Sequence, residues 1–258
     1  MATQIAASAV VHGSAVLAHD VSVGPYSIVG ENVEIGSGVE IGAHVVIERD
    51  TSVGANCRIF HGAVLGTDPQ DLKYQGERTL LTVGEDTIVR EFATLNRGTV
   101  ARGTTSVGRG CLIMAYAHVA HDCEIGDGVI LANSVNLGGN VRVDDYAIVG
   151  GMTPVHQFAR IGEHAMVGGA SRVTKDVPPF CKAAGSPIRL YGLNAVGLDR
   201  RGFAENVKRE LRQAYRLFFG SKLNVSQALA RARAELHPYP EVQRFLQFIE
   251  ESDRGITV

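Results

Sequence analysis

The chain has 258 residues, of which 25 are Lys or Arg and 27 are Asp or Glu, so its formal net charge is −2. This slightly acidic balance, without a basic stripe interleaved with aromatic residues, argues against nucleic-acid binding. No segment approaches the roughly 18 consecutive apolar residues of a membrane span, and residues 1–10 lack the basic start of a signal peptide. We therefore expect a cytoplasmic protein without a transmembrane segment.

An aliphatic residue recurs at every sixth position from Ile5 to Val173. Ile, Leu or Val occupies 26 of these 29 positions, and the exceptions are Asp71, Glu77 and Ala101. The residue four places after each aliphatic one is usually small or β-branched, so two positions in every six point inward from an extended strand. A fixed period of this kind indicates stacked units that share one core. Each hexad therefore predicts a short strand followed by a corner.

Three hexads, or 18 residues, would close one triangular coil, and parallel coils would stack at about 4.8 Å, the spacing of hydrogen-bonded strands. We predict such an all-β parallel helix for residues 1–187. The pattern is interrupted at residues 66–82 and 101–106, which we expect to project as loops. Loops on a rigid scaffold often carry function, so both are candidate parts of a site.

Beyond residue 178 the apolar residues change to helical spacing. Steps of three and four in residues 203–218 predict one helix, Asn224 is a candidate cap for a second, and Pro240 is a candidate first residue of a third. Residues 188–258 are therefore predicted to form a small α-helical C-terminal domain.

The two predicted domains differ in charge. Residues 1–187 carry 13 basic and 19 acidic groups, whereas residues 188–258 carry 12 basic and 8 acidic groups. A positively charged tail favours an acidic partner.

Winding the chain at 18 residues a coil stacks polar residues that are distant in the sequence. They form one ridge, which comprises His118, His121, Asp122, Asn136, Gly139, Asn140 and Gln157. A histidine next to a carboxylate is an arrangement for a general base, because the carboxylate fixes the imidazole tautomer and stabilises the imidazolium. His121 and Asp122 fit that role, and the Gly139 N–H could stabilise an oxyanion.

No serine or cysteine nucleophile accompanies the ridge, so direct attack by a substrate hydroxyl is the more natural chemistry. Two alternatives stay open at this point. The histidines could be solvated corner residues, or His118 and His121 could bind zinc with His61 or His156, although their three-residue separation does not suit the known three-imidazole sites of such coils. Three cysteines lie on the small inward row and are interpreted as core residues: Cys57, Cys111 and Cys123.

Eight short motifs occur in order along nearly the whole chain. They are QDLKY at 70–74, NRGT at 96–99, AHVAHDC at 117–123, GGMT at 150–153, VHQF at 155–158, VGG at 167–169, GLN at 192–194 and RRGF at 200–203. At these residues the chain resembles the UDP-N-acetylglucosamine acyltransferases of lipid A biosynthesis, a hexapeptide-repeat family. The resemblance implies a left-handed coil and a homotrimer with active sites in clefts between adjacent coils.

The resemblance also implies the first step of lipid A biosynthesis. His121 would remove the proton from the 3-hydroxyl of UDP-N-acetylglucosamine as that oxygen attacks the thioester of a 3-hydroxyacyl chain on acyl carrier protein. Asp122 would orient His121, and the Gly139 N–H would stabilise the oxyanion. The acyl donor is carried on phosphopantetheine, with no bound cofactor and no metal. Positions that match substrate-binding positions of the family are Asp71, Lys73, His118, Asn140, His156, Gln157, Gly169, Asn194 and Arg201.

Three of these positions carry further implications. Asn194 and Arg201 match tail positions near the UDP and pantetheine end, and Gly169 matches a position that can close the acyl groove. A glycine there implies a longer acyl chain.

The chain departs from the family pattern at Asn140, where the family commonly has histidine, and at Val196, where it has an acidic residue. The same transfer to a 3-amino sugar, giving an amide, is therefore an alternative. A second is the related N-acyltransferase of the pathway, whose extra N-terminal domain we do not expect before a coil that begins at residue 5. A third is a non-catalytic trimerising module, which would not need the ridge at His121.

Overall fold

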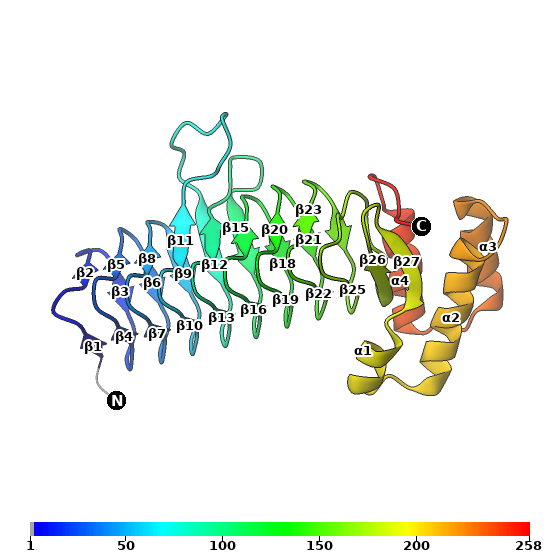
Figure 1. Ribbon diagram of the computed structural model, residues 1–258, viewed down its shortest axis with the longest axis horizontal. Helices are drawn as coiled ribbons and strands as arrows, with labels where there is room; N and C mark the ends of the chain where they lie inside the picture. Colours follow the sequence, from blue (N-terminus) through cyan, green and yellow to red (C-terminus); the bar gives the residue numbers. More distant parts are fainter. Residues whose placement is uncertain (1–2) are drawn as a thin grey trace.

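The computed structural model describes residues 3–258 as a triangular prism of short strands with a helical tail at its C-terminal end (Figure 1). The strands form three parallel sheets, of 11, 8 and 8 strands, which we call faces I, II and III.

Face I contains β1 (Gln4–Ile5), β4 (Ser22–Val23), β7 (Glu40–Ile41), β10 (Arg58–Ile59), β13 (Ile88–Val89), β16 (Leu112–Ile113), β19 (Ile130–Leu131), β22 (Ile148–Val149), β25 (Met166–Val167), β26 (Cys181–Ala184) and β27 (Arg189–Leu193). Face II contains β2 (Val10–Val11), β5 (Ile28–Val29), β8 (Val46–Ile47), β11 (Val64–Thr67), β14 (Thr94–Asn96), β17 (His118–Val119), β20 (Asn136–Leu137) and β23 (Pro154–Val155). Face III contains β3 (Val16–Leu17), β6 (Glu34–Ile35), β9 (Thr51–Val53), β12 (Leu80–Val83), β15 (Thr104–Val107), β18 (Glu124–Ile125), β21 (Arg142–Val143) and β24 (Arg160–Ile161).

Each strand pairs in parallel with the strand one coil further along the chain. Val119 pairs with Leu137, at the predicted separation of 18 residues. At the two insertions the separation grows to 30, between Leu65 and Leu95, and to 24, between Leu95 and Val119. Because 30 and 24 are both multiples of six, the hexad phase survives both insertions.

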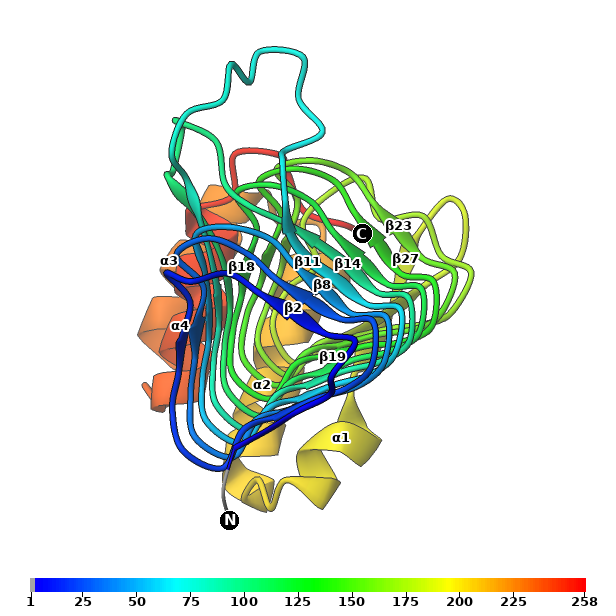
Figure 2. The same cartoon turned by 90° about the vertical axis from the view of Figure 1, so that its left-hand side faces the viewer.

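The coil is left-handed. Viewed from the N-terminal end in Figure 2, the chain passes from face I to face II to face III counterclockwise as it recedes. Parallel crossovers in other folds are nearly always right-handed. Many corners hold a non-glycine residue in the left-handed backbone region, with φ between 53° and 64°. The predicted left-handed parallel β-helix with a helical tail is thus confirmed.

The core of the prism is one continuous cluster built from the two inward rows of the repeat. Leu65, Leu95 and Val119 from the aliphatic row are fully buried, as are Cys57 and Cys123 from the small row. The three exceptions to the aliphatic row lie in the insertions, outside the coil. They therefore leave no polar group in the core.

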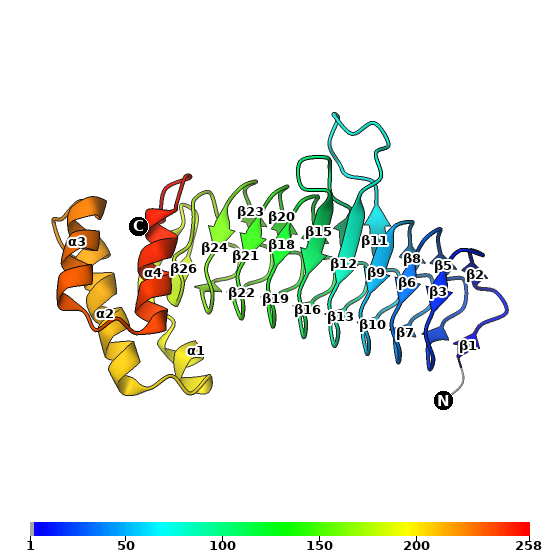
Figure 3. The same cartoon turned by 180° about the vertical axis from the view of Figure 1, so that it is seen from behind.

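Both insertions project from the edge between faces II and III (Figures 1 and 3). They connect β11 to β12 through residues 68–79 and β14 to β15 through residues 97–103. The predicted bounds, 66–82 and 101–106, overlap the ends of these strands.

The tail contains α1 (Ala195–Arg200), α2 (Glu205–Phe219), α3 (Val225–Glu235) and α4 (Pro240–Glu250). The last three are the helices that spacing predicts, and Asn224 caps α3 with a reciprocal capping box to Gln227. The short α1 has no comparable signal in the sequence. The predicted domain border at 187/188 falls in the turn of an antiparallel hairpin between β26 and β27, so face I continues across it.

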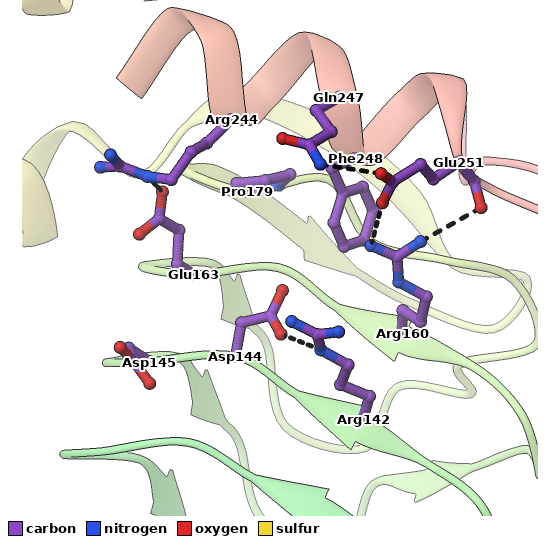
Figure 4. A pocket seen from close by; sticks show the side chains of 10 residues that line it. All are labelled: Arg142, Asp144, Asp145, Arg160, Glu163, Pro179, Arg244, Gln247, Phe248 and Glu251. Atoms are coloured by element: carbon purple, nitrogen blue, oxygen red, sulfur yellow. Dashed lines mark hydrogen bonds and ion pairs between the residues drawn. The ribbon is translucent and has the colours of Figure 1, made fainter. Parts of the chain in front are cut away.

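The tail packs on the outer side of face III through α4 (Figures 2 and 4). A hollow of about 350 Å³ lies along this seam. Arg244 of α4 forms an ion pair with Glu163, and the Arg160 guanidinium lies 4.3 Å from the centre of the Phe248 ring. The charged groups of the hollow are largely paired with one another, so it reads as a junction between prism and tail. Within residues 3–258, no helix is both long and apolar enough to cross a membrane.

Candidate active site

His121 and Asp122 lie at the II/III edge, at the corner between β17 and β18. Both projecting loops lie at the same edge, on coils nearer the N-terminus, and Gly139 and Gln157 follow it on the next two coils. The 18-residue winding therefore places the predicted ridge beside the two loops.

The Asp122 carboxylate is fully buried and accepts three hydrogen bonds. Its Oδ1 accepts from Thr99 N (2.8 Å), and its Oδ2 accepts from Thr99 Oγ1 (2.7 Å) and His121 Nδ1 (2.8 Å). Its backbone N–H donates to Thr105 Oγ1 (2.8 Å). Burial by itself would raise the pKa of Asp122, but the hydrogen bonds from Thr99 and His121 outweigh burial and lower it. Asp122 is therefore ionised at neutral pH.

An ionised Asp122 decides the tautomer of His121. A carboxylate only accepts, so the ring nitrogen that contacts it, Nδ1, carries the hydrogen and Nε2 keeps its lone pair. The His121 side chain is 16% exposed, so a substrate can reach it. Nε2 lies beside Gly139, where a β-carbon would approach it to 2.6 Å. The site thus presents a general base next to a bare stretch of backbone.

The Gly139 N–H is available as a hydrogen-bond donor. Its neighbours are used by the coil: Gly138 N donates to Val155 O (2.9 Å) and Asn140 N donates to His121 O (3.0 Å). Within the described residues, no protein oxygen accepts a hydrogen bond from Gly139 N. This geometry suits a donor to a developing oxyanion.

His118 lies on the outer side of β17, one corner before His121. Thr94 Oγ1 lies 2.7 Å from its Nδ1. Burial, together with the nearby charge of His121, lowers the pKa of His118. A neutral imidazole at this place can hold a substrate hydroxyl or carbonyl without competing for the proton.

Three other predicted residues also occupy the II/III edge. His156 and Gln157 are exposed at the corner after β23, and His156 Nδ1 lies 3.0 Å from Gln157 O. Asn140 lines a hollow on face III together with Arg102 and Phe158. These residues surround the dyad without contacting its carboxylate.

The remaining predicted residues lie apart from His121 in this chain. Asp71 and Lys73 are in the loop 68–79, where Lys73 N donates to Asp71 Oδ1 (3.0 Å). Asn194 caps α1, and the Arg201 guanidinium lies 4.1 Å from the centre of the Tyr146 ring at the III/I edge. Gly169 is at the I/II edge, where a β-carbon would meet Gly151 O at 3.2 Å. One chain therefore distributes the predicted set over all three edges.

The sequence analysis assigned no role to three threonines that contact the catalytic side chains or their backbone. Thr94 contacts His118, and Thr99 and Thr105 contact Asp122. The motif NRGT at 96–99 was the available signal for Thr99, but its partner 23 residues away does not follow the 18-residue rule.

The described residues also bear on metal binding. Within residues 3–258, no group of three or more His, Cys, Asp or Glu side chains is arranged to hold a metal ion. The nitrogens of His118 and His121 that face the protein instead contact Thr94 and Asp122. All four cysteines are buried as free thiols, as predicted for the three on the inward row.

Comparison with known proteins agrees with this geometry. Residues 176–257 match the family description "Udp N-acetylglucosamine O-acyltransferase; Domain 2", and residues 104–139 match the bacterial transferase hexapeptide. The acyl-[acyl-carrier-protein]–UDP-N-acetylglucosamine O-acyltransferase of Myxococcus xanthus is 48% identical over 98% of this chain and 99% of its own. The enzyme of that name from Thermodesulfovibrio yellowstonii is 45% identical over 98% of both chains.

The solved structures give the same result. The UDP-N-acetylglucosamine O-acyltransferase of Moraxella catarrhalis superposes with a TM-score of 0.96 at 39% identity, covering 98% of this chain and 99% of that one. Likeness of this extent spans the coil, both loops and the tail. The chain therefore belongs to the UDP-N-acetylglucosamine O-acyltransferase family.

Proposed function

We propose that this protein transfers a 3-hydroxyacyl chain from acyl carrier protein to the 3-hydroxyl of UDP-N-acetylglucosamine, the first step of lipid A biosynthesis. The observation that carries the assignment of roles is the dyad, in which buried, ionised Asp122 leaves the Nε2 lone pair of His121 beside the Gly139 N–H. The names of the close relatives supply the substrates. No observation favours the amide product or the non-catalytic module.

The reaction needs one base and one oxyanion donor. His121 Nε2 takes the proton of the sugar 3-hydroxyl while its oxygen bonds to the thioester carbonyl carbon. The Gly139 N–H stabilises the resulting oxyanion, and Asp122 stabilises the imidazolium. The C–S bond then breaks, and His121 returns the proton to the phosphopantetheine sulfur. The chemistry is complete with these groups and calls for no bound cofactor or metal.

The surface supports a homotrimer. The I/II edge carries exposed large apolar side chains on successive coils, among them Tyr26, Phe92, Tyr116 and Met152, which is 65% exposed. Phe92 and Tyr116 stack at 5.3 Å between ring centres. A row of this length along one edge marks a protein interface. We place it on the threefold axis.

A trimer with the I/II edge at its axis completes the site. Face II of one subunit then packs against face I of the next, so the II/III edge with His121 adjoins the neighbour's III/I edge. That edge carries Asn194 and Arg201, which one chain alone keeps away from His121. Face I also supplies an outward apolar row to accompany an acyl chain: Ile88, Leu112, Ile130, Ile148 and Met166.

The donor's carrier protein fits the tail. Arg209, Arg212 and Arg216 are exposed at steps of three and four along α2, so they share one side of the helix. Such a basic stripe would meet an acidic carrier protein. We place the reaction in the cytoplasm, since four buried free thiols suit a reducing compartment.

The substitution His121→Ala tests the function. We expect turnover to fall by about 10²- to 10⁴-fold, the usual effect of losing a general base, with the trimer intact. The assay follows product mass from UDP-N-acetylglucosamine and carrier protein loaded with a mixture of 3-hydroxyacyl chains.

His19→Ala is a matched control, because His19 also precedes an aspartate at a corner, with 3.2 Å between Nδ1 and Asp20 Oδ2, but its side chain is 81% exposed. Full activity in His121→Ala would remove His121 from its role, and absence of acylated product with the wild type would overturn the function itself.

A further inference from the structure

Thr99 lies in the second inserted loop and reaches the catalytic dyad from outside the coil. It is 8% exposed. Its backbone N–H and its hydroxyl each bind a different oxygen of the Asp122 carboxylate, at 2.8 and 2.7 Å. Two donors from one residue define the plane of the carboxylate, so Oδ2 is held toward His121 Nδ1.

Buried hydroxyls on the small row of this coil normally serve the backbone. Ser27 donates to Gly42 O, Thr87 to Gly108 O and Thr153 to Gly168 O. Thr99 has the same phase in the hexad repeat, yet the insertion directs its hydroxyl to a side-chain carboxylate. Its hydrogen bond is therefore not the one that stacking coils requires.

The exposed pair His19–Asp20 shows how a similar dipeptide differs elsewhere. Asp20 has a 37% exposed side chain, whereas the Asp122 side chain is fully buried. A buried carboxylate stays ionised only when hydrogen bonds replace its lost hydration. Besides His121 itself, the side-chain and backbone donors to the Asp122 carboxylate both come from Thr99.

We propose that Thr99 is a positioning residue for catalysis: it holds Asp122 as an aligned anion, so that His121 keeps its proton on Nδ1 and its lone pair on Nε2. This proposal rests on His121 being the general base. It also gives the second inserted loop a function, since that loop brings Thr99 to the dyad.

The test compares Thr99→Val, which keeps the shape and removes the hydroxyl, with Thr99→Ser, which keeps the hydroxyl. For Thr99→Val we expect kcat to fall about 10- to 100-fold, as for other small misalignments of a catalytic group, with KM for the nucleotide sugar unchanged. The dyad's negative charge is then less stabilised and binds a proton more readily, so the acid limb of the kcat profile moves to higher pH. Thr99→Ser should restore both kcat and the profile.

Thr87→Val is the matched control, because Thr87 is equally buried but binds only backbone, at the III/I edge. A merely structural role for Thr99 would lower thermal stability in both valine variants and leave both pH profiles in place, and that result overturns the proposal. If Thr99→Val does not fold, the smaller Thr99→Ala is read in the same way. An inactive His121→Ala with a normal Thr99→Val rejects this inference alone, whereas an active His121→Ala rejects the base as well.

Discussion

At the scale of single residues, the active site depends on a missing side chain as much as on the groups present. A β-carbon at position 139 would lie 2.6 Å from both Cε1 and Nε2 of His121. Contact at that distance forces the imidazole to move, and a displacement of about 1 Å costs on the order of 10²-fold in rate. We expect Gly139→Ala to lower kcat by about that factor while the melting temperature changes little. Gly13→Ala is the control, since a β-carbon there meets no atom within 4 Å.

His164 makes a prediction about pH. Burial, with the charges of Arg201 and Arg244, lowers its pKa to about 4 from the ordinary 6.5. Between these values the unfolded chain binds a proton that the folded chain does not. Stability therefore decreases as pH falls from about 6.5 to about 4, by at most about 1 kcal/mol per pH unit, and is unaffected above that range.

His164→Phe should reduce this loss, because phenylalanine keeps the stacking on Tyr146 and does not titrate. Urea unfolding at pH 7.5 and pH 5 measures the difference. His44→Phe is the matched control, since His44 stacks on Tyr26 at another corner but is exposed. Equal acid sensitivity in wild type and His164→Phe would contradict the assignment.

At the scale of elements, the two loops are connected to each other and to the dyad. Arg97, a fully buried arginine, binds Gly66 O and Asp68 at the base of the first loop. Asn96 binds Thr67 Oγ1 (2.6 Å) in the same place. Residues 96–99 therefore hold the loop that carries Asp71 and Lys73 on one side and Asp122 on the other.

Arg97→Met should release the first loop. Methionine fills the space but makes none of these hydrogen bonds, which we expect to cost about 1–3 kcal/mol. Limited proteolysis should then cut within residues 68–79 faster than in the wild type, and KM for the nucleotide sugar should rise. Arg90→Met, at a partly exposed arginine that contacts Phe60 and Glu91, should leave the cleavage rate unchanged. Equal cleavage of the two variants would show that Arg97 does not anchor the loop.

At the scale of the whole molecule, the active site is predicted to require more than one chain. Tyr116 is 61% exposed and stacked on Phe92 in the middle of the I/II edge. A charge there would be buried at the proposed threefold axis, three times over. We expect Tyr116→Glu to give monomers in light scattering and to lose activity, while circular dichroism retains the β-helix signal. Val225→Glu, at an equally accessible position of the tail, should remain trimeric. A trimeric, active Tyr116→Glu would place the interface elsewhere.

Periodicity by itself determined the coil, its register and part of the site. Because inward positions recur every six residues, the contact between His121 and Gly139 follows from their separation of 18 residues alone. The helices α2 to α4 follow in the same way from steps of three and four, with Asn224 as a cap. These features repeat a local rule, so they can be read without knowing the path of the chain.

Only the tertiary structure decided what departs from that rule. Thr99 reaches Asp122 because an insertion folds back over the edge, and no repeat encodes that path. Asn194 and Arg201 match the family's site, yet they lie at another edge from His121. The dipeptides His19–Asp20 and His121–Asp122 are the same in sequence and differ in burial. Burial and loop paths depend on contacts between distant segments, and those contacts separate a solvated corner from a catalytic dyad.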